Sequence, residues 1–111
     1  MPFSFHIKIT VAPENAEKFL AALKPVFEGF AAEPECTYFE VFQDPENPGT
    51  FRLVENWNAT KEQIFEVQLK KDYYKSYAAE TEPLWIKPRE VEVWERMPSR
   101  EWTKSKRENF M

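Results

Sequence analysis

The first residues of the chain alternate between apolar and polar side chains, and this period of two predicts a strand with one apolar face. The apolar positions are Phe3, Phe5, Ile7, Ile9 and Val11. From Pro13 the spacing changes to three and four residues, which predicts a helix that has Pro13 in its first turn. Its apolar positions are Ala16, Phe19, Leu20, Leu23, Phe27 and Phe30. Pro25 lies inside this pattern, where we expect it to kink or divide the helix.

The middle of the chain predicts a hairpin followed by a second helical region. Two β-rich runs, 36–43 and 51–57, are separated by residues 44–49, which favour a turn. Thr60 is placed to cap the helical region, which we expect to break near Asp72 and to end before Pro83. The residues that recur at steps of four in it are Phe65, Leu69, Tyr73 and Tyr77. A last alternating run at 91–97 predicts the final strand.

The order strand-helix-strand-strand-helix-strand predicts an α+β fold of the ferredoxin-like βαββαβ kind. Two helices would cover one face of a four-stranded antiparallel sheet. We assign residues 1–97 to this domain and residues 98–111 to a basic C-terminal tail. The tail is either a solvated terminus or an arm whose Trp102 packs on a partner subunit.

The strands carry apolar residues of both parities, which predicts a second subunit against the sheet. Phe39, Val41, Val54 and Trp94 fall opposite in parity to the residues assigned to the helix-facing stripe. Large apolar groups on an open sheet face would be a liability, and a second copy of the chain is the simplest cover. We therefore expect a homodimer.

Composition narrows the range of partners. The chain has 111 residues and a net charge of −4, so the basic surface expected of a nucleic-acid-binding protein is missing. Cys36 is the single cysteine, which excludes an intrachain disulfide and a thiolate metal cluster. No signal peptide and no apolar run long enough to span a membrane are found, so we expect a cytoplasmic protein that binds neither nucleic acid nor membrane.

Four segments in order resemble the antibiotic biosynthesis monooxygenase family over residues 3–97. These segments are Glu35-Cys36-Thr37-Tyr38, Glu55-Asn56-Trp57, the Tyr73–Tyr77 stretch and Val91-Glu92-Val93-Trp94. The resemblance implies a dimeric α+β barrel with a pocket between sheet and helices in each subunit. It also implies oxidation of a phenolic, enolic or similar activated substrate by molecular oxygen, without metal or flavin. The sequence agrees, since it has no glycine-rich phosphate loop and no metal-ligand spacing.

Several residues are candidates for the chemistry. His6 is the only histidine and hence the obvious general base, while Asn56, Trp57 and Tyr73 are matched to the family's site region. Substrate contacts are expected from Tyr38, Tyr77 and Trp85. We expect Trp57 and the Tyr73/Tyr77 side of the second helix to line one internal pocket, and Asn56 to point to the opposite face of its strand.

Other readings stay open at this point. Glu55 is a carboxylate in an apolar strand, so burial could raise its pKa toward that of a base, or it could pair with Arg52, Arg89 or Arg96. Family members often have a histidine at the position matched to Tyr73, and the haem-degrading branch needs a histidine on that helix to hold iron. The tyrosine removes the main support for haem, so we expect none, although a tyrosine is also able to ligate haem iron. The alternatives to a monooxygenase are a small-molecule isomerase, which would use the same deprotonation, and a non-enzymatic dimeric ligand-binding or stress-response protein.

Overall fold

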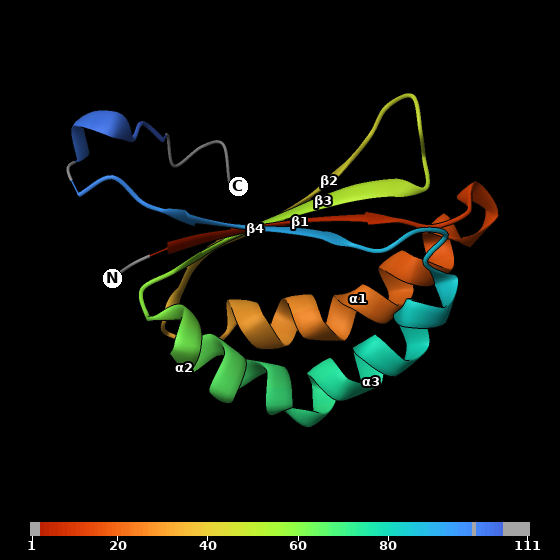
Figure 1. Ribbon diagram of the computed structural model, residues 1–111, viewed down its shortest axis with the longest axis horizontal. Coiled ribbons are helices and arrows are strands. Elements are labelled where there is room, and N and C mark those ends of the chain that lie inside the picture. The colour runs from red at the N-terminus through yellow and green to blue at the C-terminus, as the bar shows by residue number, and fades with distance from the viewer. Residues whose placement is uncertain (1–2, 99, 106–111) are drawn as a thin grey trace.

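A computed structural model describes residues 3–98 and 100–105 of the chain. It contains one four-stranded antiparallel sheet with helices on one side (Figure 1). The strands are β1 (Phe3–Thr10), β2 (Cys36–Gln43), β3 (Thr50–Trp57) and β4 (Glu90–Glu95), in the spatial order β2-β3-β1-β4. The predicted α+β ferredoxin-like fold is therefore confirmed.

The helix layer contains one long helix and one interrupted helix. The long one is α1 (Ala16–Ala31), which follows the short 3₁₀ turn η1 (Pro13–Asn15). The interrupted one comprises α2 (Lys61–Glu66), η2 (Gln68–Lys70), α3 (Asp72–Thr81) and η3 (Glu82–Leu84). The break predicted near Asp72 is confirmed, because Lys71 has an extended backbone between η2 and α3.

Pro25 does not divide α1, so that part of the prediction is wrong. The helix runs without a break through Pro25, whose side chain is exposed. Leu23, Val26 and Phe30, on the opposite side, are buried against the sheet. Packing of this apolar face on both sides of the proline holds the helix together despite the missing backbone donor.

A bulge in β2 alters which side chains face the helices. The register between β2 and β3 shifts between Cys36 and Tyr38, so that Phe39 and Val41 pair with Glu55 and Leu53 on the helix-facing side. Our assignment of Phe39 and Val41 to the outer face is therefore wrong, because one extra residue inverts the parity after it. Val54 and Trp94 do lie on the outer face, opposite His6 and Ser4 respectively.

Both glycines lie where another chain segment approaches closely. A Cβ atom on Gly29 of α1 would lie 2.8 Å from the ring of Tyr73, and one on Gly49 would lie 2.0 Å from the carbonyl oxygen of Val11. Gly29 thus allows α3 to pack on α1, and Gly49 allows the β2–β3 loop to reach the end of β1.

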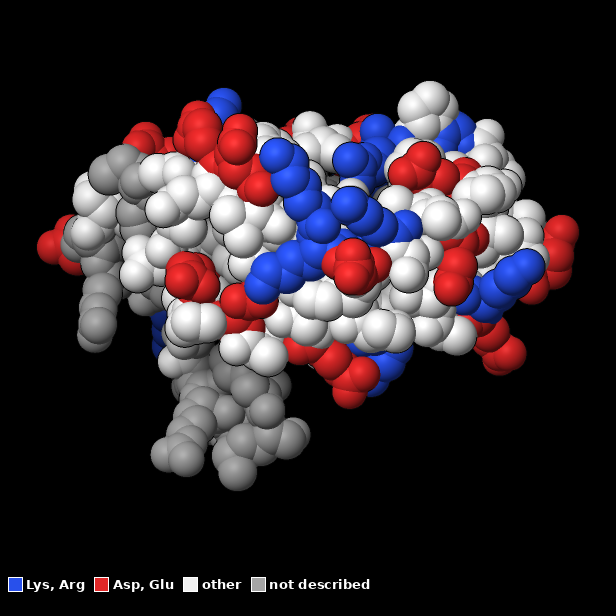
Figure 2. All heavy atoms as spheres, turned by 90° about the horizontal axis from the view of Figure 1, so that it is seen from below, with Lys and Arg blue, Asp and Glu red and all other residues white. Residues whose placement is uncertain are grey.

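The solvent side of the helix layer is charged, as expected for amphipathic helices over one core. Figure 2 shows this face, on which basic side chains gather near the middle with acidic ones around them. Within the described residues, no helix combines the length and the apolar character that crossing a bilayer requires.

The C-terminal tail begins above the sheet, on the side opposite to the helices (Figure 1), with a 3₁₀ turn at Arg100–Trp102 and an exposed Trp102. Residues 106–111 of the tail lie outside the described part.

Candidate active site

An internal cavity lies between the sheet and the helices. Its volume is about 30 Å³, enough for roughly one water molecule. The described residues that line it come from every layer of the fold, and they are mostly apolar. They are Phe5, Ile7, Ile9, Leu23, Val26, Phe30, Phe39, Leu53, Glu55, Ile64, Leu69, Tyr74, Tyr77 and Arg89.

Glu55 supplies a carboxyl group to this cavity from the middle of β3. It occupies a helix-facing position that is apolar in its neighbours Leu53 and Trp57, and it is only 2% exposed. Burial raises its pKa from 4.5 to about 7, because water no longer solvates the charged form. The hydrogen bond from Trp57 and the positive charge of Arg89 act in the opposite direction but do not offset the burial.

Trp57 holds the Glu55 carboxyl in place from outside the cavity. Its Nε1–H donates a hydrogen bond of 2.9 Å to Oε1 of Glu55, and its ring is fully buried against Phe30. The described residues that line the cavity do not include Trp57. The prediction that it lines the pocket is therefore wrong, since the strand places its indole beside the carboxyl and under α1.

Arg89 brings a positive charge to the same cavity. Its Nη1 donates a hydrogen bond of 3.1 Å to the hydroxyl of Tyr74, and its guanidinium carbon lies 5.6 Å from the centre of the Trp85 ring. The guanidinium group is thus held on two sides. Trp85 is half-buried and bridges to Val11, so the structure places it behind Arg89 and outside the described cavity lining.

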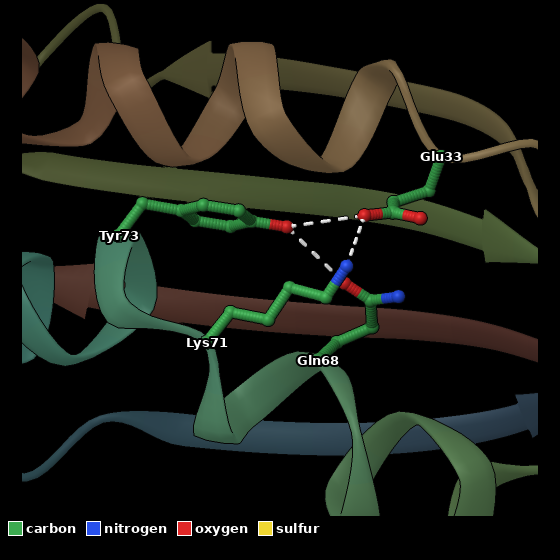
Figure 3. Close-up of polar contacts among 4 residues, drawn as sticks. All are labelled: Glu33, Gln68, Lys71 and Tyr73. Carbon is green, nitrogen blue, oxygen red and sulfur yellow. Dashed lines mark hydrogen bonds and ion pairs between the residues drawn. The ribbon is translucent and has the colours of Figure 1, made fainter.

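Tyr77 and Tyr73 lie one turn apart on α3, but their side chains lie in different surroundings. Tyr77 lines the cavity, as predicted, and burial raises the pKa of its hydroxyl above the usual value of 10. Tyr73 instead directs its hydroxyl to Oε1 of Gln68 at 3.2 Å and to Oε1 of Glu33 at 3.5 Å (Figure 3). Lys71 donates to the same Glu33 oxygen at 2.6 Å.

The prediction that Tyr73 lines the internal pocket is therefore wrong. Gly29 lets the far end of its ring approach α1 closely, and its hydroxyl lies beside Glu33, just after the C-terminal end of α1, and outside the cavity lining.

The remaining predicted residues lie on the outer face of the sheet. Ser4 Oγ and His6 Nε2 are hydrogen-bonded at 2.8 Å, and Tyr38 donates to Oε1 of Glu40 at 2.5 Å. Asn56 pairs with Ser4 in the sheet and so points away from Trp57, as predicted. Tyr38 and Asn56 line an outer groove of about 530 Å³ together with Thr37, Arg96, Thr103, Lys104 and Ser105. The sheet thus separates His6, Tyr38 and Asn56 from the internal cavity.

From the sequence, His6 was the preferred candidate for the general base and Glu55 was an alternative. No role was predicted for Tyr74. Glu55 stands at a helix-facing position of a strand whose other helix-facing residues are apolar, and this parity was the signal that could have ranked it first. Within the described part of the chain, no group of three or more His, Cys, Asp or Glu side chains is placed to hold a metal ion.

Comparison with known proteins gives a consistent result. The family model for antibiotic biosynthesis monooxygenases matches residues 2–80. GME11364 of Pestalotiopsis microspora, a candidate monooxygenase, is 44% identical over 101 residues, which cover 91% of this chain and 84% of that protein.

Solved structures agree in fold. A candidate antibiotic biosynthesis monooxygenase from Nitrosomonas europaea has a TM-score of 0.79 at 18% identity, covering 87% of this chain and 91% of its own. A conserved protein from Methanosarcina mazei Go1 has a TM-score of 0.77 at 22% identity, covering 87% and 94%. At these identities the structures are evidence for the shared fold alone.

Proposed function

The chain belongs to the antibiotic biosynthesis monooxygenase family, and from this premise we propose that it is a cofactor-independent monooxygenase acting on a small phenolic or enolic substrate. The observation that carries this proposal is Glu55, a buried carboxyl with a pKa of about 7 inside an apolar cavity. A base with this pKa is half ionised near neutral pH, where it can accept a proton from a weak carbon or oxygen acid.

The proposed reaction begins with removal of a proton by the Glu55 carboxylate. For a substrate with an activated CH₂ group, the electron pair of the C–H bond stays in the conjugated system as a carbanion or enolate. This anion passes its electrons to molecular oxygen, one at a time, and a C–O bond forms to give a peroxide. Glu55 returns its proton to the terminal peroxide oxygen.

The second half of the reaction breaks the O–O bond. Glu55 removes the remaining proton from the same carbon, the C–H electron pair becomes the π bond of a new carbonyl, and the O–O bond breaks. The leaving hydroxide takes the proton from Glu55 and departs as water. One O₂ is consumed, one oxygen atom enters the product and the other leaves in water, so the substrate itself is the reductant.

Arg89 and Tyr77 are the groups we assign to anion stabilisation. Both line the cavity with Glu55, and the guanidinium of Arg89 is fixed by Tyr74 and Trp85 before substrate arrives. A positive charge and a phenol donor that are already oriented in an apolar site stabilise developing negative charge without reorganisation. The apolar lining of the rest of the cavity suits the body of a flat aromatic molecule.

The outer face of the sheet supports a second proposal, that the protein is a homodimer. Trp94 is exposed on this face, beside the imidazole of His6 at a ring distance of 6.4 Å. A second copy would cover such a ring, and Trp102 of the tail is exposed as well. Light scattering at micromolar concentration tests this: a mass near twice that of the chain supports the dimer, and the mass of one chain contradicts it.

Anthrone is a suitable first probe for the reaction, because removal of one proton from its CH₂ group gives an aromatic anion. With ¹⁸O₂, we expect one O₂ to be consumed for each molecule of product, and one labelled oxygen atom in that product. 10,10-Dimethylanthrone, which has no removable proton at this carbon, serves as the matched control. Conversion without oxygen uptake would favour the isomerase, and saturable binding without any conversion would favour a non-enzymatic binding protein.

A further inference from the structure

The exposed edge strand β4 pairs with β1, whose helix-facing residues line the internal cavity. Val91 pairs with Ile7 and Val93 pairs with Phe5, so both valines face the helix side. Ile7 and Phe5 line the cavity. Yet Val91 is 41% exposed and Val93 is 45% exposed, because the helix layer does not reach over this edge. An apolar surface therefore leads from solvent toward the cavity wall.

Phe65 of α2 contacts one residue of the cavity wall and is itself partly exposed. Its ring contacts the ring of Phe5 edge-on, with centroids 5.9 Å apart and an angle of 75° between the planes. The preceding residue, Ile64, is buried and lines the cavity, whereas Phe65 is 41% exposed. The ring of Phe65 is thus in contact with the cavity-lining residue Phe5 and is also open to solvent.

The polar contacts of α2 are local, which leaves the helix able to shift. Thr60 and Gln63 form a capping box with each other at its N-terminus. Beyond its C-terminus, the ion pair between Lys71 and Glu33 anchors the chain to the end of α1 (Figure 3). Between these ends, α2 is held over the sheet by apolar contacts of Ile64 and Phe65, which have no fixed direction and so do not tie the helix to one position in the way that hydrogen bonds do.

A movement of this kind is required if the cavity is to hold a substrate. A volume of about 30 Å³ holds roughly one water molecule, whereas small-molecule sites have several hundred Å³. Phe30 stacks on Tyr74 with an angle of 3° between the rings, which ties α1 to α3. At the edge strand β4, by contrast, the helix-facing residues Val91 and Val93 form an exposed apolar surface.

We propose that substrate enters between α2 and β4, and that Phe65 is the residue that determines which sizes of substrate enter. This inference rests on the proposed function, since the molecule that enters is the substrate of that reaction. Phe65 is a specificity-determining residue and takes no part in proton transfer. Its ring must turn or move with α2 each time a ligand enters or leaves.

The test measures ligand binding without oxygen, so that entry is separated from chemistry. Stopped-flow quenching of tryptophan fluorescence under nitrogen gives association rate constants for anthrone and for phenol. We expect Phe65→Ala to raise the rate constant for anthrone about tenfold and that for phenol much less, and Phe65→Trp to lower the rate constant for anthrone. Val67→Ala removes an exposed apolar side chain just after α2 and serves as the matched control, expected to leave both rate constants unchanged.

Several results would overturn the inference. One is that wild type, Phe65→Ala and Phe65→Trp have equal rate constants. A second is that neither probe binds saturably to wild type or to Phe65→Ala. A third is that the substitutions change only the oligomeric state, which would make Phe65 a subunit contact. Failure of the proposed function gives a different pattern: binding that depends on Phe65 under nitrogen, with no oxygen uptake in air. That pattern supports the entrance while removing the monooxygenase.

Discussion

The indole N–H of Trp57 donates a hydrogen bond of 2.9 Å to Oε1 of Glu55, and both side chains are buried. Since the two residues share one face of β3 at a spacing of two, the strand itself sets this geometry. The bond stabilises the charged form of the carboxylate and leaves its second oxygen for the cavity. Trp57 is therefore a positioning residue that acts through Glu55.

Replacing Trp57 by Phe removes the donor while keeping a large ring. Loss of this bond raises the pKa of Glu55 further. Because the ionised carboxylate is the active form, a higher pH is then needed to reach the same activity. A hydrogen bond to a charged group is worth about 1.5–3 kcal/mol, so we expect the rate at pH 6 to fall roughly tenfold or more and to recover toward wild type at high pH. The pH profile of kcat/KM with anthrone measures this.

Trp94→Phe is the matched control for that substitution, because Trp94 also donates to a glutamate two residues away but lies exposed on the outer face. Its profile should coincide with that of wild type. A Trp57→Phe variant that loses the same fraction of activity at every pH would assign Trp57 a structural role only.

The free energy of unfolding should depend on the ionisation of Glu55. Because the pKa is raised from 4.5 to about 7 in the folded protein, stability from this group is complete below pH 4.5 and is lost as pH rises to about 7. Compared with Glu55→Gln, wild type should lose about 3 kcal/mol over this interval. Urea unfolding of both proteins between pH 4 and 8 tests the difference, and parallel curves would contradict a raised pKa.

Substitution of the two glycines by alanine should have unequal effects. At Gly49 the added methyl group meets the backbone carbonyl of Val11, which cannot move without disturbing β1. At Gly29 it meets the far end of the Tyr73 side chain, which can turn aside. We expect Gly49→Ala to cost about 2–4 kcal/mol in unfolding free energy and Gly29→Ala about 1 kcal/mol. The reverse order in urea unfolding would contradict the described packing.

Tyr77→Phe and Tyr73→Phe should separate a cavity phenol from a structural one. Tyr77 lines the cavity, so loss of its hydroxyl should lower kcat by about 10- to 1,000-fold with little change in Tm. Tyr73 contacts Glu33 and Gln68 instead, so loss of its hydroxyl should lower Tm by a few degrees and leave kcat near wild type. Equal kcat values in the two variants would remove the assigned role of Tyr77.

Much of the fold could be predicted from periodicity, because both the sheet and the helices have one buried face. The alternation from Phe3 to Val11 and the break near Asp72 are local signals. Two features were not predictable in this way. The bulge between Cys36 and Tyr38 adds one residue without any mark in the sequence, and Pro25 is tolerated because of packing partners distant in the chain.

The candidate site was less predictable than the fold. His6 was chosen because it is the only histidine, but its strand position places it on the outer face of the sheet. Glu55 reaches a pKa of about 7 only through burial, which depends on the assembled helix layer. Tyr73 and Tyr77 belong to the same predicted apolar stripe and carry the same phenol group, so the sequence does not distinguish them. In the structure, the close approach to α1 that Gly29 permits places the Tyr73 hydroxyl away from the cavity.

The role of Glu55 as the base that starts oxidation is tested most directly by oxygen uptake in wild type and Glu55→Gln with anthrone at pH 8. The amide keeps the volume of the side chain but cannot accept the proton, and by the linkage argument the variant should be at least as stable as wild type at this pH. We predict that wild type consumes one O₂ per product molecule and that Glu55→Gln is slower by at least about 100-fold. An unchanged rate in a folded Glu55→Gln protein would contradict the account.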